Sequence, residues 1–282
     1  MPGGRCFMTF REKLVNAAQR NDSLLCVGLD PDPDRLHAVD VTDFLCSIIE
    51  ATSDLVCAYK PNLAFYEQLG KGGYASLRAV LAAIPKDIPV IADAKRGDVG
   101  HTAEAYARAI FEELGFDAAT VNPYLGGDSV EPFLAREDKA AIIVCRTSNL
   151  GAGDFQDLPV EFEGERRPLY EVVAERAKAW NKRGNVGLVA GATYPGELAR
   201  LRELCPDMLL LVPGVGAQEG DLAAAVRAGL DEDDAGIIIN ASRQVLYDGN
   251  GGRSADSARR EALSLRDAIE RERTAKRQEL RA

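Results

Sequence analysis

The densest group of chemically useful side chains is the segment DAKRGD at residues 93–98, directly after the apolar run 89–92. If 90–95 is a strand, side chains alternate between its faces, so Asp93 and Lys95 point the same way. Gly97 allows a sharp turn, after which Asp98 projects from the following loop. Lys60, at the end of another apolar run, can approach the same place. Charges inside apolar strands are costly unless they are paired. The group is therefore either a catalytic array with a fixed ammonium or a structural lattice of ion pairs.

A second candidate is an anion site formed by the segment PGVGAQ at 213–218 together with Arg243. Small residues let backbone N–H groups approach a phosphate, and arginine adds charge-assisted hydrogen bonds. The glycine spacing GxGxxxG at 214–220 is a poor match to a dinucleotide fingerprint, and the chain has no Walker A sequence. The alternative is a glycine-rich turn with a surface arginine.

Several other chemistries are disfavoured by composition. The two histidines, His37 and His101, cannot form a three-histidine zinc site, and each reads better as a surface or helix-start residue than as a catalytic base. The six cysteines lie at least 11 residues apart, so there is no CxxC pair, and those at 26, 57 and 145 are expected to pack as small apolar residues. Alternating aspartates at 30, 32 and 34 suggest a cation site, but the prolines between them rule out an EF-hand loop.

The overall charge limits the class of partner. Lys plus Arg is 34 against 44 for Asp plus Glu, a formal charge of -10, which argues against a nucleic-acid or anionic-membrane surface. No apolar run approaches the ~18 residues of a membrane span, and the first residues show no signal-peptide pattern. We expect a cytoplasmic protein.

Short apolar runs alternate with helical patterns along the whole chain. Most runs are bounded by Gly, Pro or Asp, as expected for strands buried on both faces. The strand candidates are 24–29, 55–60, 90–95, 118–122, 140–146, 186–192, 209–213 and 236–241. Helical patterns include 74–84, 102–114, 169–181, 196–204 and 221–228, flanked by one near 10–20 and a long charged one at 254–280.

Eight strands in βα alternation predict an α/β fold, and the count favours a closed (β/α)8 TIM barrel over an open sheet. No linker or repeat divides the chain, so residues 1–282 are expected to form a single domain with flanking N- and C-terminal helices. Residues 1–8 are expected to be disordered, and the C-terminal helical extension at 254–282 to fray beyond Arg271. The stretch 149–168 reads as the longest loop without periodicity and as a lid or binding loop.

In a barrel, functional groups gather at the carboxyl ends of the strands. The residues predicted there, in chain order, are Asp30, Lys60, Asp93 with Lys95, Asn122, Thr147 with Ser148, Ala192 with Thr193, Gly214 with Gly216, and Arg243.

These segments make the chain resemble the orotidine 5'-monophosphate decarboxylase family, and its longer bacterial branch (type 2) in particular. The matching motifs run in order from about residue 10 to 248: CVGLDPD (26–32), YKPNLAFYE (59–67), DAKRGDVGHT (93–102), VNPYLGGDSVEPF (121–133), CRTSN (145–149), PGVGAQ (213–218) and INASR (239–243). The resemblance implies a homodimeric barrel that uses no metal and no organic cofactor. Its reaction converts orotidine 5'-monophosphate to uridine 5'-monophosphate and CO2, the last step of de novo UMP biosynthesis.

The resemblance also implies catalytic roles. Lys95 is similar to the lysine that protonates the ring carbon vacated by CO2, and Asp93 to the carboxylate beside the substrate carboxylate. Lys60 completes the alternating charges. Asp98 and Thr102 resemble the residues that reach the neighbouring subunit's site.

The implied substrate-binding residues are Asp30 for the ribose, Ser148 for the pyrimidine, and Pro213, Gly214, Gly216, Gln218 and Arg243 at the phosphate. Three rival functions remain open at this point. They are a magnesium-dependent sugar-phosphate decarboxylase or aldol-type enzyme sharing DxKxxD, a non-catalytic phosphate- or nucleotide-binding barrel, and a purely structural ion-pair lattice.

Overall fold

The computed structural model describes residues 7–36, 39–214, 221–233, 235–247 and 254–279. Its main element is one sheet of eight parallel strands in the order β2-β1-β10-β9-β8-β5-β4-β3. Bridges from Tyr59 to Val90 and from Asn62 to Asp93 join β2 to β3, so the two ends of the sheet meet as a barrel. The strands are β1 (Leu25–Gly28), β2 (Ala58–Lys60), β3 (Ile91–Arg96), β4 (Ala118–Val121), β5 (Ala140–Arg146), β8 (Val186–Ala190), β9 (Leu209–Pro213) and β10 (Ile237–Ala241).

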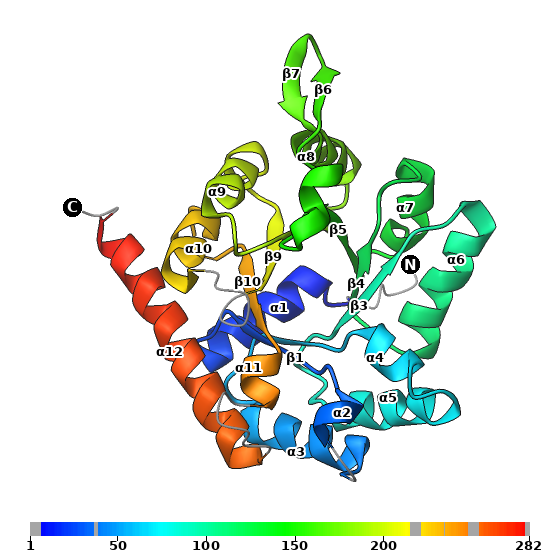
Figure 1. The fold of residues 1–282 in the computed structure, drawn as a ribbon, viewed down its shortest axis with the longest axis vertical. Helices are drawn as coiled ribbons and strands as arrows, with labels where there is room; N and C mark the ends of the chain where they lie inside the picture. The colour runs from blue at the N-terminus through cyan, green and yellow to red at the C-terminus, as the bar shows by residue number, and fades with distance from the viewer. Residues whose placement is uncertain (1–6, 37–38, 215–220, 234, 248–253, 280–282) are drawn as a thin grey trace, which may run out of the picture.

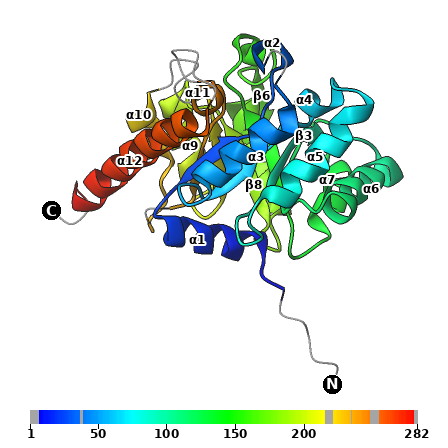
Figure 2. The ribbon, with the colours of Figure 1, turned by 90° about the horizontal axis from the view of Figure 1, so that it is seen from below.

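Helices surround the barrel on its outer side, and one further helix, α1, lies across its end (Figures 1 and 2). They are α1 (Phe10–Asn21), α2 (Pro33–Leu36), α3 (Val41–Thr52), α4 (Leu63–Glu67), α5 (Lys71–Ala83), α6 (Gly100–Arg108), α7 (Gly127–Leu134), α8 (Leu169–Trp180), α9 (Pro195–Leu204), α10 (Leu222–Gly229), α11 (Arg243–Leu246) and α12 (Ala255–Glu279). A π-helical turn, Ala109–Glu113, continues α6. The predicted (β/α)8 fold is confirmed, with every expected strand present.

Alternation along the strands produces two apolar layers. One set of buried side chains, including Cys26, Ile91, Ile142 and Ile238, forms a cluster of its own. The alternate residues of the same strands pack with the helices in the larger core. The inner set fills the barrel, so the interior is packed rather than open.

Helix α1 closes the end of the barrel at which the strands begin. It lies across that end in Figure 2, and its Phe10 and Leu14 belong to the inner apolar cluster. A capping box between Thr9 and Glu12 starts the helix. Because α1 blocks this end, the opposite end, where the strands finish, is the open mouth.

The buried cysteines behave as small apolar residues, as expected. Cys26 and Cys57 are fully buried and Cys145 is 2% exposed. Burial raises the pKa of the Cys26 thiol to about 12, so it stays protonated at neutral pH.

Two expectations about the periphery were wrong. The stretch 149–168 is not an irregular loop: it holds a 3-10 turn, Leu150–Asp154, and an antiparallel hairpin of β6 (Pro159–Phe162) and β7 (Glu165–Pro168). This hairpin extends outward beyond α8 (Figure 1). Helix α12 does not fray beyond Arg271 but continues to Glu279. Of the segment expected to be disordered, residues 1–6 lie outside the described part of the chain.

Among the helices that the structure describes, none is both long enough and apolar enough to cross a membrane.

Candidate active site

Three charged side chains form a continuous chain of ion pairs at the barrel mouth. The Lys60 Nζ lies 2.8 Å from Asp93 Oδ2, and the Lys95 Nζ lies 2.6 Å from Asp93 Oδ1. Lys60 and Asp93 have side chains only 4% and 10% exposed, whereas Lys95 is 51% exposed. The array is thus anchored in the barrel at Lys60 and presents one ammonium, Lys95, to the mouth.

The array holds its charges at neutral pH. Burial alone would raise the pKa of Asp93, but the ammonium groups of Lys60 and Lys95 outweigh burial and hold this pKa well below its usual range. Burial alone would lower the pKa of Lys60, but the carboxylates of Asp93 and Asp30 outweigh it and raise this pKa above its usual range. Each group stabilises the charged form of its neighbour.

Strand β3 carries this array on a bulge rather than on regular strand. Ala92 pairs with Ala119 of β4, and the next pair is Arg96 with Val121. Between these two pairs β3 advances four residues while β4 advances only two, which is a bulge in β3. Lys95 sits in the bulge with a φ of 45°, an uncommon conformation for a non-glycine residue. Asp93 and Lys95 come together as predicted, but through this distortion and not through regular alternation.

Asp30 lies on the Lys60 side of the mouth. Its Oδ1 accepts a hydrogen bond from the Asn62 amide at 3.0 Å. Its charge also contributes to the raised pKa of Lys60, which places the two groups in electrostatic contact.

Asp98 and Thr102 stand apart from the array. The Asp98 Oδ1 accepts a hydrogen bond from the Val99 amide at 2.7 Å, and Thr102 is part of the first turn of α6. Within the described chain, no hydrogen bond or ion pair joins Asp98 to Lys60, Asp93 or Lys95. Within the described part of this chain, Asp98 is therefore not bonded into the cluster.

The described members of the predicted phosphate set, Pro213, Gly214 and Arg243, lie where β9 and β10 end side by side. Pro213 is paired with Asn240, so the loops after these two strands start next to each other. Gly214 follows Pro213, and Arg243 begins α11 with an exposed side chain. Gly216 and Gln218 lie outside the described residues, as does His37.

Ser148 follows β5 and is half-buried. It packs so closely against Gly191 that a Cβ at position 191 would lie 2.9 Å from the Ser148 Cβ. The preceding residue, Thr147, is fixed by Gln156, which accepts from its amide at 2.8 Å and donates to its hydroxyl at 2.7 Å. The segment carrying Ser148 is thus held from both sides.

Comparisons with known proteins place the chain in a family. Residues 23–258 match the family described as Orotidine 5'-phosphate decarboxylase / HUMPS family. The chain belongs to this family.

Curated bacterial relatives named orotidine 5'-phosphate decarboxylase align over nearly their full length. The protein of Thermomicrobium roseum is 55% identical over 271 residues, covering 94% of this chain and 96% of the relative. That of Ralstonia pickettii is 50% identical, covering 93% and 98%. The structure of Leishmania donovani OMP decarboxylase has a TM-score of 0.84 at 44% identity, covering 95% of this chain and all of that one.

Two further buried polar residues lie on β4 and β5 of this member of the decarboxylase family, and the first of them contacts the charged array. Thr120, in β4, donates from its hydroxyl to Asp93 Oδ1 at 3.1 Å. Arg146, at the end of β5, is 3% exposed; its guanidinium lies 4.4 Å from the ring centre of Tyr194 and 3.3 Å from Asp157 Oδ1. The available signal was a polar residue inside an otherwise apolar strand.

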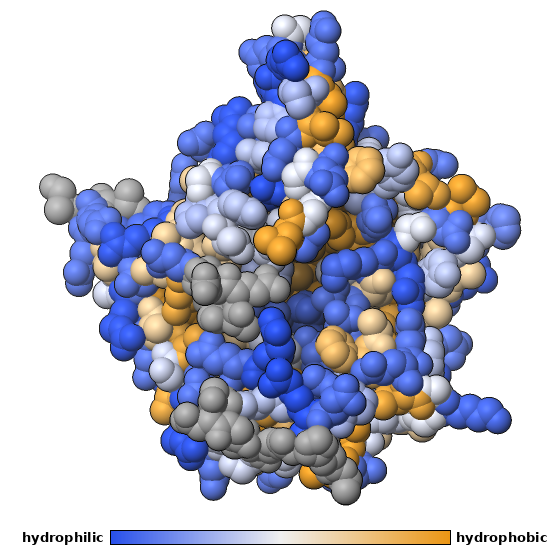
Figure 3. Space-filling model, viewed as in Figure 1, coloured by the Kyte–Doolittle hydropathy of each residue, from blue (hydrophilic) through white to orange (hydrophobic). Residues whose placement is uncertain are grey.

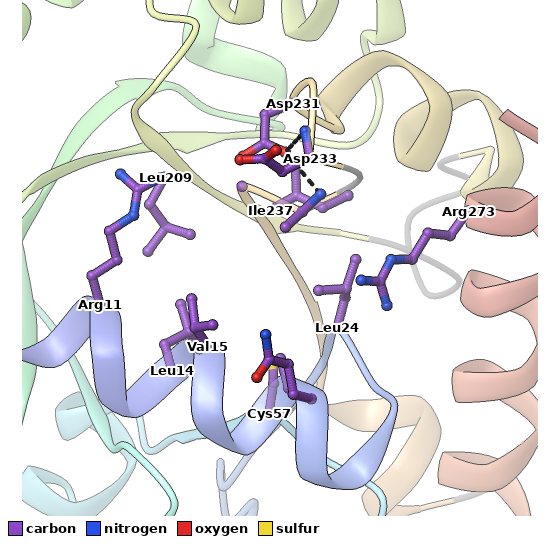
Figure 4. Close-up of a pocket in the computed structure, with 14 residues that line it drawn as sticks. Arg11, Leu14, Val15, Leu24, Cys57, Leu209, Asp231, Asp233, Ile237 and Arg273 are labelled. Carbon is purple, nitrogen blue, oxygen red and sulfur yellow. Dashed lines mark hydrogen bonds between the residues drawn. The ribbon is translucent and has the colours of Figure 1, made fainter. Parts of the chain in front are cut away.

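The molecule is hollowed at the centre of the face that carries the strand ends (Figure 3). A neighbouring cavity of about 1010 Å³ opens beside the ends of β4 and β5, lined by Asn122, Tyr124, Phe155 and Trp180 among others. Another cavity, of about 400 Å³, lies at the opposite end, between α1 and α12 (Figure 4). None of the predicted site residues lines that second cavity, so it is separate from the decarboxylase-family site.

The charged array leaves little capacity for a cation. Both oxygens of Asp93 are taken by ammonium groups. In the part of the chain that is described, no three His, Cys, Asp or Glu side chains are grouped so that they could hold a metal ion.

Proposed function

We propose that this chain decarboxylates orotidine 5'-monophosphate to uridine 5'-monophosphate and CO2, the last step of UMP biosynthesis, without a metal or organic cofactor. The observation that carries the proposal is the Lys60–Asp93–Lys95 array at the barrel mouth of a chain from this family. Relatives at 50–55% identity bear the corresponding name.

The chemistry requires positive charge where a carbanion forms. When the bond from the ring carbon to the carboxylate breaks, its electron pair stays on the ring carbon, where resonance stabilises it poorly. The Lys95 ammonium, held at Asp93, stabilises that charge and then donates a proton to the same carbon. CO2 leaves and the neutral lysine is reprotonated from solvent.

Asp93 has a second role in the ground state, because it faces the substrate carboxylate. At about 4 Å and an effective dielectric of about 20, that repulsion is on the order of 4 kcal/mol. Since each ~1.4 kcal/mol is tenfold, repulsion accounts for roughly a thousandfold acceleration. The larger contribution must come from the preorganised charges, which need no reorganisation during the reaction.

The remaining mouth residues bind the substrate. Asp30 takes a ribose hydroxyl and Ser148 the pyrimidine. The phosphate lies between the loops after β9 and β10, on Pro213, Gly214, Gly216, Gln218 and Arg243. Binding energy from this remote phosphate can be used to close the site around the reacting carbon.

A homodimer completes the site, with Asp98 and Thr102 entering the partner's mouth. The separation of Asp98 from the array within one chain supports this arrangement. The apolar side chain of Val99, next to Asp98 in the chain, is also 54% exposed. Exposed apolar groups on loops at a barrel mouth are typical of an interface.

We further infer that residues 1–282 act as a single barrel domain in the cytoplasm. Helix α12 packs against α3, α10 and β1, which ties the C-terminal segment to the barrel. The cysteines at 26, 46, 57, 145 and 205 are free thiols, as expected in a reducing compartment.

The deciding experiment is an absorbance assay of orotidine 5'-monophosphate turnover in EDTA, beside the Lys95→Ala variant. Turnover by the wild-type chain that Lys95→Ala abolishes is the expected result. Activity that EDTA removes would instead favour a magnesium-dependent sugar-phosphate enzyme of the same family. Binding without turnover would favour a nucleotide-binding barrel.

A further inference from the structure

At the bulge in β3, two backbone amides are bound by one side chain of the neighbouring strand β4. The regular register with β4 breaks after Ala92 and resumes at Arg96, so Ala94 and Lys95 lie in the irregular part of the pairing. Their amides both donate to the Thr120 Oγ1, at 3.0 Å from Ala94 N and 2.9 Å from Lys95 N. One buried hydroxyl thus accepts hydrogen bonds from two consecutive backbone amides of the bulge.

The proton of the same hydroxyl is directed by these two bonds. A threonine hydroxyl has two acceptor lone pairs and one donor proton, and both lone pairs are taken by the amides. The Asp93 Oδ1 lies at 3.1 Å and the Ala92 carbonyl at 3.5 Å, so the carboxylate is the better acceptor. Thr120 is 1% exposed, so water does not compete for this bond.

We propose that Thr120 is a positioning residue for the decarboxylation, fixing the Lys95 backbone and the Asp93 carboxylate with a single hydroxyl. Asp93 Oδ1 is the same oxygen that accepts from Lys95 Nζ at 2.6 Å. Thr120 therefore orients both partners of the catalytic ion pair without facing the substrate. This role rests on the proposed decarboxylase function.

The half-exposed Lys95 makes such a support necessary. Its side chain has solvent on one side and its backbone adopts an uncommon left-handed conformation. Catalysis by a fixed ammonium requires placement within roughly 0.5 Å, which flexible lysine side chains achieve only when their supports are rigid. Thr120 supplies that rigidity from β4, where Ala119 and Val121 on either side are fully buried.

The test compares Thr120→Val, which keeps the shape and removes the hydroxyl, with Thr120→Ser, which keeps the hydroxyl. We expect Thr120→Val to lower kcat about tenfold to a hundredfold with little change in KM, and Thr120→Ser to retain most of kcat. The acidic limb of the kcat profile should move to higher pH in Thr120→Val. Losing the hydrogen bond to the carboxylate raises the pKa of Asp93, so Asp93 is protonated earlier as the pH falls.

Thr52→Val is the matched control, because Thr52 is an equally buried threonine whose hydroxyl bonds to the Ile48 carbonyl of α3 and to the Tyr59 hydroxyl, and to no member of the charged array. It should lower thermal stability without changing kcat or the pH profile. If Thr120→Val does not fold, Thr120→Cys takes its place, because a thiol is similar in size to the hydroxyl and is a weaker hydrogen-bonding group. The positioning role then predicts a kcat for Thr120→Cys below that of the wild-type chain.

Normal kcat in Thr120→Val, or in Thr120→Cys if only that variant folds, would overturn the positioning role. Equal kcat losses in the Val and Ser variants would do so too. An inactive wild-type chain in the same assay would instead overturn the decarboxylase function, and the role of Thr120 with it.

Discussion

Replacement of Lys95 by alanine separates catalysis from stability most cleanly, because the side chain is half-exposed while its partner stays paired. In Lys95→Ala, Asp93 keeps its 2.8 Å ion pair with the buried Lys60, so no isolated charge is left in the barrel. A half-exposed pair contributes about 0–1 kcal/mol to the free energy of unfolding. For a chain of this size, that corresponds to a change in Tm of less than about 4 °C.

The expected effect on turnover is far larger. Loss of a general acid costs about a factor of 10² to 10⁴, and loss of preorganised charge about 10² to 10³ more. The product is at least ~10⁴, which places Lys95→Ala below the background of an absorbance assay. The matched control is Lys86→Ala, which removes an exposed lysine from the turn before β3, at the opposite end of the barrel.

The assay pairs turnover of orotidine 5'-monophosphate in EDTA with thermal unfolding of the same samples. Near-normal turnover in Lys95→Ala would refute the mechanism. Inactivity caused by a collapse of Tm would support the structural ion-pair lattice instead.

Three further predictions concern the other groups of the site. The pKa of Asp93 is held below its usual range in the folded protein. Its ion pairs therefore stabilise the fold at pH values above about 4, the carboxyl pKa of the unfolded chain. This stability is lost as the pH falls through the pKa of Asp93 in the folded protein. The difference in unfolding free energy between wild type and Asp93→Asn should therefore shrink in acid denaturation below about pH 4. Mixing Lys95→Ala with Asp98→Ala homodimers should restore partial activity, since one site of each hybrid is intact; verified heterodimers without recovery would argue against shared sites. Arg243→Ala should raise KM roughly tenfold to a hundredfold through lost charge-assisted bonds to phosphate, and an unchanged KM in steady-state kinetics would remove Arg243 from the phosphate site.

The barrel strands were predictable because strands buried on both faces are continuous apolar runs with clear boundaries. Strands β5 and β9 have the predicted bounds, and the others differ mainly at their ends. The charged residues at those ends could also be found, since a lysine or aspartate is conspicuous in an apolar run.

The bulge at Lys95 could not be predicted, because it depends on tertiary contacts between two strands. The hydroxyl of Thr120 on β4 accepts from two backbone amides of the bulge in β3, and these residues lie about 25 positions apart in the sequence. Regular alternation correctly predicted that the side chains of Asp93 and Lys95 lie together. It wrongly predicted a regular strand at Lys95, where the structure has a bulge.

The hairpin at Pro159–Pro168 had a local signal that was weaker than usual. Its two-residue turn, Glu163–Gly164, has φ values of 53° and 81°, as a type I′ turn requires. Asn or Asp before the glycine is the usual sequence signal for this turn, and here that position is Glu163. Without that signal, the two strands, each only four residues long and rich in charged residues, were predicted as part of a loop.

The end of α12 was misjudged because several of its charges are paired with groups of a neighbouring helix. Arg227 of α10 bonds to Glu272 at 2.7 Å and to Glu279 at 3.1 Å, and Lys276 donates to the Leu230 carbonyl at 3.1 Å. Composition alone cannot distinguish such a docked face from a fraying one, since both are rich in Arg and Glu.

The net charge of -10 takes on a different meaning beside the proposed site. The substrate is itself an anion, so the field of the whole molecule repels it at long range. Attraction must come from a few positive groups placed at the mouth, with Lys95 half-exposed at one end and Arg243 exposed at the other. Lys60 cannot serve this purpose, because it is buried and neutralised by Asp93. The two lysines of the array therefore have different tasks: the buried Lys60 fixes the Asp93 carboxylate, and the half-exposed Lys95 contacts the substrate.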